Sequence, residues 1–415
     1  MRELAVYFRG ELAGTLVESS GKLSLRYLPN APQVSLAMPV RSEPWPDPNV
    51  RPFILGFLPD SADQLSLLAR EIGAARTDIF AILAHIGADC AGAIQFLEPG
   101  TPPSKTGTLT QLSDGDIEAR LRELRTQNNP AWILEHEHWS LAGTQEKFAL
   151  HRVPGTASWY AADGAIPSTH IVKPGVVRLH AQALIEAVSM RTLTNLGLPA
   201  AYTQYHYFGS EPALVSERGD RVWEGEKLLR LTQEDLCQAL SVLPEQKYEA
   251  DGGPGIAHIA KLFDKIGLAA RERFAFLQSL IANYLLCATD AHAKNFSLTW
   301  DTGGVHLAPL YDVASAAPYV HPREKVRLAM KIGGENRADA IRERHWARCA
   351  GDLGFTEEQV LNEIELQRFE LPTAFRLATE SIARELFASG HGFTPEESKA
   401  LEAMNAYIQR VSQGK

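Results

Sequence analysis

The stretch Ala288–Leu298, ATDAHAKNFSL, places a cluster of polar residues between two apolar segments. The run FAFLQSLIANYLLC precedes it and FSLTW closes it, and both patterns are typical of buried elements. Charged side chains are rarely buried unless something pairs with them. The cluster is therefore either a solvated turn between a helix and a strand or part of a functional site, and the rest of the chain has to decide between the two.

Asp290 and Asn295 are five residues apart. Phosphoryl transfer from ATP needs a carboxylate that accepts the proton of the acceptor hydroxyl and a nearby ligand for Mg²⁺, and protein kinases supply both at the same interval, as Asp-x-x-x-x-Asn. Lys294, between the two, could neutralise charge on the transferring group. The spacing by itself is a weak signal, because chance produces it often.

A second metal carboxylate is expected on a neighbouring strand, and VHLAPLYD provides Asp312 at the end of an apolar run. Two protein oxygens, completed by ATP oxygens and waters, suit Mg²⁺, which keeps much of its hydration shell. With Asp312 included, a metal site explains the polar cluster better than a solvated turn does.

Lys173 and Glu186 match a pair found in kinase-like folds, a strand lysine that holds the α/β-phosphates and a helix glutamate that fixes this lysine. Lys173 ends the strand-like THIVKP, and Glu186 lies in the following helical segment. A surface lysine and a solvated helix residue are the plainer alternatives. Gly143, in WSLAGTQEKFAL, allows a tight turn whose amides could bind phosphate, although a simple hairpin turn explains one glycine equally well.

The bulk composition describes a soluble globular protein. The chain has 415 residues, too many for one ordinary core, with 45% hydrophobic and 22% charged residues and a net charge of -9. The net negative charge gives no sign of a protein that binds nucleic acid by itself. Four scattered cysteines, no signal peptide and no apolar run of about 20 residues predict a cytoplasmic protein without a membrane span.

The order of patterns predicts an α+β fold in four parts. Residues 1–98 read as a β-meander followed by helices, and residues 99–130 as a proline-rich linker and a polar helix. Residues 131–225 alternate strands with one helix, which is the order of a kinase-like nucleotide lobe. Residues 226–415 read as largely helical, and DGGPG at 251–255 is most simply a loop.

Together these segments resemble one family, the HipA serine/threonine kinases, which are the toxins of bacterial HipBA toxin–antitoxin modules. The resemblance covers nearly the whole chain and preserves the order of its motifs. The motifs are VYFRGELAGTL, RPFILGFLPD, GADCAGAIQF, SLAGTQEK, PSTHIVKP, LTQEDLCQALSVLPEQKYEADGGPG, ATDAHAKNFSL, LAPLYDV and LAMKIGG. It implies a two-lobed protein-kinase-like fold with an N-terminal α+β subdomain, and ATP and Mg²⁺ as cofactors.

The resemblance also implies roles for individual residues. Asp290 would be the catalytic base, Asn295 and Asp312 the metal ligands, and His292 and Lys294 further members of the catalytic loop. The nucleotide would be held by Leu141, Ala142, Gly143, Thr144, Gln145, Glu146, Lys147, Lys173, Glu186, Glu217, Gly219 and Asp220. Within this set, Glu217 and Gly219 would face adenine and Asp220 would contact the ribose.

Ser140 matches the serine that these kinases autophosphorylate. A phosphoserine adds about -1.5 to -2 charge, which would repel ATP or displace the phosphate loop, so we expect phospho-Ser140 to be inactive. The alternative for Ser140 is a turn serine that bonds its own backbone.

Three functions follow as hypotheses. The first is a protein kinase toxin whose target resembles an aminoacyl-tRNA synthetase, such as glutamyl-tRNA synthetase. The second is a small-molecule phosphotransferase of kinase-like fold. The third is a non-catalytic co-repressor that binds a HipB-like helix-turn-helix antitoxin and reaches operator DNA only through it. No membrane partner is expected.

Overall fold

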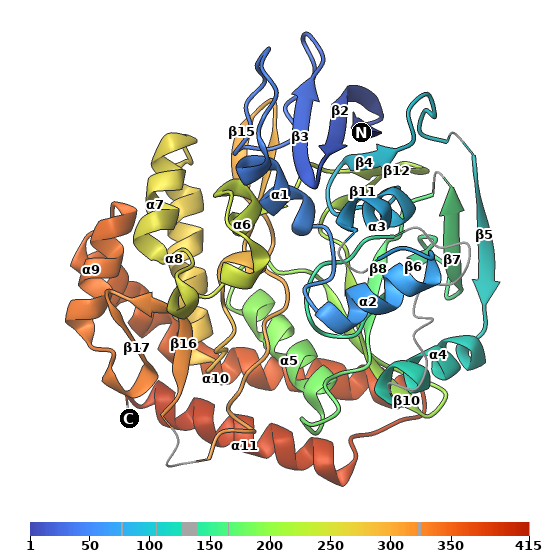
Figure 1. Ribbon diagram of the computed structural model, residues 1–415. Helices are drawn as coiled ribbons and strands as arrows, with labels where there is room; N and C mark the ends of the chain where they lie inside the picture. Colours follow the sequence, from blue (N-terminus) through green and yellow to red (C-terminus); the bar gives the residue numbers. More distant parts are fainter. Residues whose placement is uncertain (76–77, 105, 127–138, 165, 322–324, 415) are drawn as a thin grey trace. The chain divides into compact units, whose positions relative to one another are not determined.

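The computed structural model describes residues 1–75, 78–104, 106–126, 139–164, 166–321 and 325–414 (Figure 1). The chain forms two compact units, each assembled from three segments. The first unit contains Met1–Lys173, Glu217–Glu245 and Thr299–Asp301, and the second contains Pro174–Ser216, Gln246–Leu298 and Thr302–Lys415.

The first unit begins with an antiparallel sheet in the order β3-β2-β1-β4, built from β1 (Arg2–Phe8), β2 (Glu11–Ser19), β3 (Lys22–Tyr27) and β4 (Ile94–Leu97). The period-2 pattern of the sequence predicted the first three strands, and Arg9-Gly10 turns the chain between β1 and β2 with both φ angles positive. Three helices intervene before β4: α1 (Asp47–Leu55), α2 (Ala62–Glu71) and α3 (Ile79–Ile86).

The remainder of the first unit is also mixed. Its strands are β5 (Gly107–Leu112), β6 (Phe148–Arg152), β7 (Trp159–Gly164) and β8 (His170–Lys173), which are neighbours in the order β5-β7-β6-β8, then the hairpin of β11 (Arg221–Glu224) and β12 (Lys227–Arg230), and β13 (Glu234–Asp235). Its other helices are α4 (Asp114–Thr126) and α6 (Leu236–Ala239). A capping box formed by Asp235 and Gln238 begins α6.

The second unit is mostly helical. Its helices are α5 (Gln182–Asn195), α7 (Ile256–Lys265), α8 (Ala270–Leu285), α9 (Glu343–Leu353), α10 (Glu357–Ala388) and α11 (Pro395–Ser412). Its strands are β9 (Thr203–Phe208), β10 (Glu211–Glu217), β14 (Ser297–Asp301, whose last three residues belong to the first unit), β15 (Gly304–Leu307), β16 (Arg327–Ile332) and β17 (Glu335–Arg337).

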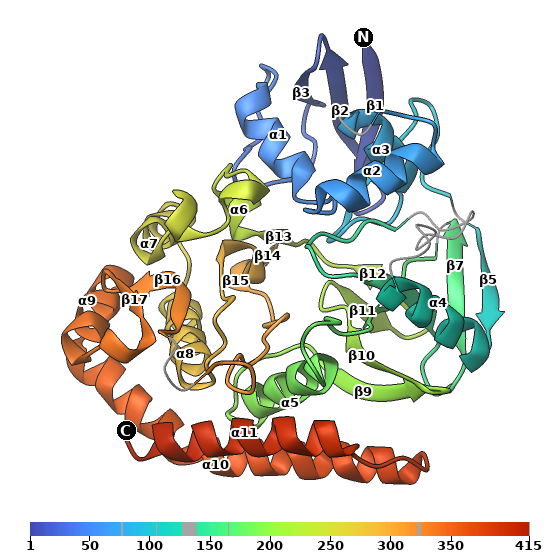
Figure 2. The same ribbon diagram turned by 60° about the horizontal axis from the view of Figure 1, so that its bottom comes forward.

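Helix α10 organises this unit, because it packs against α5, α8, α9 and α11 (Figure 2). Its buried residues recur at helical spacing, among them Val360, Ile364, Leu371 and Phe375. Arg191 of α5 is tied to it by an ion pair to Glu385, with 2.6 Å between Nη1 and Oε1. The packed helices of this unit therefore support the segment that follows α8.

The predicted meander, the glycine-stopped helices and the strand–helix–strand order between Phe148 and Glu217 are confirmed. The sequence analysis missed β5, the β11–β12 hairpin and the β16–β17 hairpin. These strands are short and have few buried residues, so they carry little apolar alternation, and only their pairing reveals them. No helix in the described ranges is long and apolar enough to cross a membrane.

Candidate active site

The polar cluster of the sequence forms a compact loop in the second unit. It lies between the end of α8 and β14, and a short 3₁₀ turn, Ala293–Asn295, shapes it. The N–H of His292 donates to the carbonyl of Asp290 at 2.8 Å, and the N–H of Asn295 donates to the carbonyl of His292 at 2.9 Å. Asp290 is exposed, whereas His292, Lys294 and Asn295 are buried. The loop thus exposes one carboxylate to solvent, while the three polar side chains that follow it are held in the interior.

Asn295 braces this loop directly. Its side-chain nitrogen donates to the main-chain carbonyl of Asp290 at 2.8 Å. That hydrogen bond fixes which end of the amide is nitrogen, so the amide oxygen is the atom left for another group. An amide oxygen is a suitable ligand for Mg²⁺.

Tyr248 is a residue that the sequence analysis did not single out. Its hydroxyl donates to Oδ1 of Asp290 at 2.7 Å, and its ring meets His292 edge-on, with 4.9 Å between ring centroids. The neighbouring Lys247 accepts, at its carbonyl, a hydrogen bond of 3.4 Å from the N–H of Ala293. The available signal was the polar, glycine-rich context KYEADGGPG, but nothing in the sequence specifies the partner.

His292 is enclosed by charged groups. Burial lowers its pKa, with a further lowering by Lys247, while Asp290 and Asp312 act in the opposite direction. The Nδ1 atom of His292 is buried and has no hydrogen-bond partner in the described part of the chain. The balance favours a neutral ring that packs under the loop.

The backbone of Asp312 differs from the one that the sequence predicted. The sequence placed it on a strand, but β15 ends at Leu307, and Asp312 adopts a left-handed backbone with φ 60°. The preceding Tyr311 donates its hydroxyl to the carbonyl of Lys294 at 2.7 Å. Left-handed backbone costs energy in residues other than glycine and is concentrated at functional sites.

The residues of the second unit fit a magnesium site better than they fit a transition-metal site. No group of three or more His, Cys, Asp or Glu side chains that could hold a metal occurs among the described residues. Asn295 and Asp312 offer an amide and a carboxylate oxygen, and Mg²⁺ commonly takes few protein ligands and keeps its waters. The donor set is therefore compatible with Mg²⁺ carried in with a nucleotide.

The predicted phosphate loop lies in the first unit, ahead of β6. Gly143 has φ 106°, which L side chains rarely adopt, and its carbonyl accepts from the N–H of Asp60 at 3.2 Å. Lys147 is buried and donates from Nζ to the carbonyl of Ala142 at 2.7 Å. The adjacent carbonyls of Ala142 and Gly143 are thus both engaged, one by Lys147 across the loop and one by Asp60 from the N-terminal part of the chain.

Lys173 and Glu186 occupy the positions expected from the sequence. Lys173 is the last residue of β8 and is buried, and Glu186 is buried within α5. Glu186 accepts from the side-chain amide of Gln182 at 3.1 Å. The two residues belong to different units, so their pairing stays a prediction.

Ser140 is 1% exposed. Its hydroxyl donates to the carbonyl of Phe57, and its N–H donates to the carbonyl of Asp89 at 3.0 Å. A serine in this setting is not a simple turn residue that bonds its own backbone.

The predicted adenine hinge divides into an exposed part and a buried part. Glu217 and Gly219 are exposed at the end of β10. Asp220 is buried, and its carboxylate accepts from Arg218, Arg221 and the N–H of Gly92. The predicted ribose contact of Asp220 therefore finds no support here, because both of its oxygens are engaged inside the first unit.

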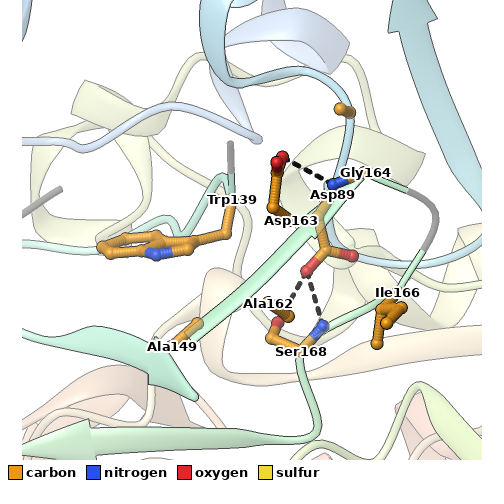
Figure 3. Close-up of a pocket in the computed structure, with 9 residues that line it drawn as sticks. Asp89, Trp139, Ala149, Ala162, Asp163, Gly164, Ile166 and Ser168 are labelled. Atoms are coloured by element: carbon orange, nitrogen blue, oxygen red, sulfur yellow. Dashed lines mark hydrogen bonds between the residues drawn. The ribbon is translucent and has the colours of Figure 1, made fainter. Parts of the chain in front are cut away.

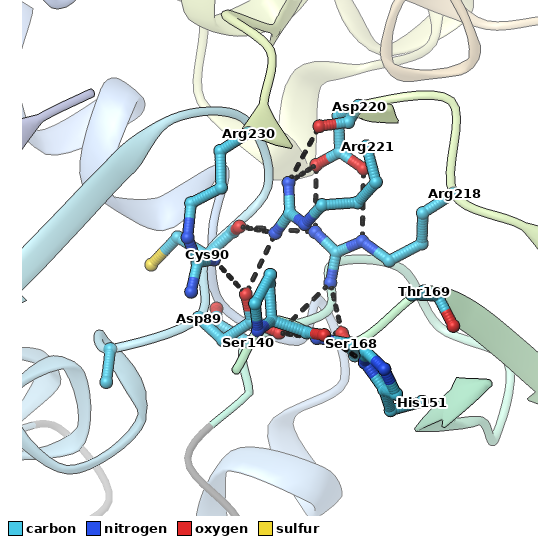
Figure 4. Close-up of polar contacts among 12 residues, drawn as sticks. Asp89, Cys90, Ser140, His151, Ser168, Thr169, Arg218, Asp220, Arg221 and Arg230 are labelled. Atoms are coloured by element: carbon cyan, nitrogen blue, oxygen red, sulfur yellow. Dashed lines mark hydrogen bonds and ion pairs between the residues drawn. The ribbon is translucent and has the colours of Figure 1, made fainter. Parts of the chain in front are cut away.

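Asp220 belongs to a buried ionic network that the sequence did not reveal (Figure 4). The network consists of Asp89, Arg218, Asp220, Arg221 and Arg230. Burial alone would raise the pKa of Asp89, but the three arginines more than offset burial and lower it. Burial lowers the pKa of Arg221 to about 10.

A small pocket lies beside this network and is lined by Asp89, Trp139, Ala162 and Ser168, among others (Figure 3). Ser168 donates from both its N–H and its hydroxyl to Oδ2 of Asp89, at 3.0 and 2.6 Å. The volume of about 10 Å³ is close to the minimum for one water molecule. The pocket is too small for a nucleotide.

Comparison with known proteins places the chain in a family. Residues 139–374 match the model of the HipA-like C-terminal domain, and residues 4–97 match the HipA N-terminal domain. A Sinorhizobium fredii protein named "Putative kinase Y4mE" is 33% identical over 347 residues, 80% of this chain and 81% of that protein. The serine/threonine-protein kinase toxin HipA of Shewanella oneidensis is 29% identical over 339 residues, 78% of this chain and 75% of that protein.

The solved structure of Shewanella oneidensis HipA, in complex with HipB and its operator DNA, is similar with a TM-score of 0.81 and 23% identity. The match covers 98% of this chain and 97% of that one. It confirms the predicted α+β fold class. Taken with the two domain models, these similarities show that the chain belongs to the HipA family of kinases.

Proposed function

We propose that the protein is an ATP- and Mg²⁺-dependent serine/threonine protein kinase that acts as the toxin of a toxin–antitoxin module. The observation that carries this proposal is the exposed carboxylate of Asp290, braced through its own carbonyl by Asn295, with Asp312 directly following Tyr311, whose hydroxyl donates to the loop carbonyl of Lys294. A base, a metal-ligating amide and a second carboxylate are the protein groups that phosphoryl transfer to a hydroxyl requires.

In this proposal Asp290 accepts the proton of the acceptor hydroxyl as that oxygen attacks the γ-phosphorus of ATP, and the bond from that phosphorus to the β–γ bridging oxygen breaks, so that ADP leaves. Asn295 and Asp312 would hold Mg²⁺, which, when bound with ATP, neutralises charge on the phosphate oxygens. Lys294, held by the loop, contributes a fixed positive charge to the same region. Lys173 and the amides of residues 141–147 would bind the nucleotide phosphates.

We further propose that Ser140 is autophosphorylated and that this modification inactivates the enzyme. Ser140 precedes the phosphate loop and is bonded to Asp89, a member of the buried ionic network. The network holds three arginines against two aspartates, so it carries an excess positive charge that a phosphate at this position would match. A phosphoserine is too large for the present contact with Phe57, so it would displace the adjoining loop.

The proposed partners are a HipB-like helix-turn-helix antitoxin and a protein substrate such as an aminoacyl-tRNA synthetase. The antitoxin is supported by the similar structure, which contains HipB and operator DNA. With a net charge of -9, this chain is a poor match for DNA phosphates, so the antitoxin would make most operator contacts.

One experiment separates the three hypotheses. Wild-type protein, Asp290→Ala and a surface control, Asp352→Ala, are each incubated with γ-labelled ATP, Mg²⁺ and a cell lysate. Loss of a catalytic base costs about 10²–10⁴-fold in rate. A labelled protein band that disappears only with Asp290→Ala supports the kinase. Label confined to small solutes supports a small-molecule phosphotransferase, and no transfer in any sample supports a non-catalytic role.

A further inference from the structure

Tyr248 makes two contacts with the proposed catalytic loop. Its hydroxyl donates to Oδ1 of Asp290 at 2.7 Å, and its ring stands edge-on to His292 with an interplanar angle of 79°. One side chain thus contacts both the proposed base and the buried ring beneath the loop. An aromatic residue that only filled space would need no such hydroxyl contact.

The segment around Tyr248 is shaped so that this side chain has a defined position. The carbonyl of Tyr248 accepts from the N–H groups of Asp251 and Gly253, at 3.1 and 2.9 Å. A Cβ atom on Gly253 would lie 1.8 Å from the carbonyl oxygen of Gln246, so only glycine fits there. The glycine-rich sequence therefore serves to fold the segment back on itself.

A second anchor fixes the same segment to β16. Glu249 accepts from the N–H of Lys331 at 2.6 Å, and its other oxygen lies 3.6 Å from Nζ of that lysine. Gly255 leaves room for the Glu249 carboxylate, which would lie 2.7 Å from an added Cβ. In turn, β16 is bonded to the catalytic loop region, because the N–H of Ala329 donates to the carbonyl of Thr289 at 3.0 Å.

An exposed aspartate does not hold its carboxylate in one orientation by itself. The terminal torsion of aspartate is broad and roughly two-fold, so either oxygen can face the acceptor. A hydrogen bond from a phenol to an ionised carboxylate is charge-assisted and strong enough to select one arrangement. With Oδ1 engaged by Tyr248, Oδ2 is the oxygen that remains for the acceptor hydroxyl.

We propose that Tyr248 is a positioning residue that orients the Asp290 carboxylate for proton abstraction, and that the segment Gln246–Gly255 is the arm that holds it. This inference rests on the proposed kinase function. A misoriented base slows the chemical step without weakening nucleotide binding, because geometry at the reacting atoms is lost while the phosphate contacts stay.

The test uses the lysate assay above, with initial rates measured over a series of ATP concentrations. Tyr248→Phe keeps the ring and removes the hydroxyl, and we expect kcat to fall about 10-fold with KM for ATP unchanged within twofold. The matched control is Tyr202→Phe, which removes the hydroxyl of an exposed tyrosine in the same unit. It should behave as wild type. Thermal unfolding of each variant shows that the fold is retained.

A double mutant distinguishes positioning from general support. If Tyr248 acts through Asp290, adding Tyr248→Phe to Asp290→Ala should produce no further loss. Equal losses in both backgrounds, a change confined to KM, or a Tyr248→Phe variant as fast as wild type each overturn the inference. By contrast, if wild type transfers no label or Asp290→Ala remains active, the proposed function itself fails.

Discussion

Asn295 and Asp290 are joined by a hydrogen bond of 2.8 Å from the side-chain amide of the first to the main-chain carbonyl of the second. The spacing of five residues thus has a structural role, because this hydrogen bond closes the loop, in addition to the chemical role proposed for the two side chains. The same bond orients the amide oxygen of Asn295 for the role proposed for it.

Replacing Asn295 by alanine should affect both roles at once. We expect kcat to fall at least about 100-fold and the Mg²⁺ concentration for half-maximal rate to rise, because the proposed metal ligand and the hydrogen bond that braces the loop are lost together. Rates measured across a Mg²⁺ series check this. Asn405→Ala, an exposed asparagine of α11, is the control, and equal Mg²⁺ dependence in wild type and Asn295→Ala would contradict the metal role.

Because Asp312 has a left-handed backbone, the effect of backbone strain on thermal stability can be measured separately from the effect of the carboxylate on transfer. Asp312→Gly removes the strain and the carboxylate together, so we expect thermal stability to be equal or higher while transfer falls at least about 100-fold. Melting curves with and without Mg²⁺-ATP check both parts. If Asp312→Gly keeps wild-type transfer, the carboxylate has no part in the reaction.

Ser140→Ala should abolish phosphate incorporation into the peptide that contains residue 140. We also expect transfer to other proteins to persist longer than in wild type, because the proposed inactivating modification could not form. Mass spectrometry of tryptic peptides after incubation with Mg²⁺-ATP, together with a time course of activity, tests both. Undiminished self-labelling of the variant would remove Ser140 from the scheme.

Glu234 should make the stability of the first unit depend on pH. Burial raises its pKa to about 8 from a value of 4.5. The folded chain therefore holds a proton between these values that the unfolded chain has released. The resulting stability is fully present below about pH 4.5 and declines by about 1.4 kcal/mol per pH unit until pH reaches about 8.

Glu234→Gln removes this dependence, because glutamine stays neutral and can still accept the 2.7 Å hydrogen bond from the N–H of Leu36. We expect the variant to gain stability relative to wild type as pH rises from 5 to 8. Urea unfolding at several pH values measures the difference, with the exposed Glu396→Gln as control. A constant difference across this range would show that Glu234 is ionised in the folded chain.

Replacing Asp89 should strongly lower the free energy of unfolding. Asp89→Ala leaves three arginines, of which Arg218 and Arg221 are buried, with one remaining aspartate, and breaking a buried ion pair in this way costs about 3–5 kcal/mol. The exposed pair of Arg376 and Glu380 is the comparison, and Glu380→Ala should cost less than about 1 kcal/mol. Similar unfolding midpoints for the two variants would show that the network contributes little to stability.

Local patterns accounted for the elements whose sequence periodicity matched their burial. The alternation around Arg9-Gly10 predicted a hairpin, and the apolar spacing of DIFAILAHIG predicted a helix that ends at Gly87. The polar cluster after α8 was located for the same reason, since its flanks are buried and its charges are confined to one short loop. These signals lie within about a dozen residues of one another.

Features that depend on distant partners could not be predicted. Tyr248 and Asp290 are 42 residues apart, and Asp89 and Arg221 are 132 apart, so no local pattern joins them. Asp220 matched a ribose position in the sequence, but its direction is set by Arg218 and Arg221. Backbone choices such as the left-handed Asp312 are likewise set by tertiary packing rather than by propensity.

The buried position of Ser140 has a consequence for the autophosphorylation proposed above, because it would delay that reaction. A reaction at a hydroxyl that is 1% exposed requires local unfolding of that part of the first unit. Such local unfolding becomes rarer as the local packing improves. If Ser140 is phosphorylated as proposed, the rate of that modification should therefore depend on how often the packing around Phe57 opens. A higher temperature, or a smaller side chain at position 57, should therefore raise the rate of the proposed modification.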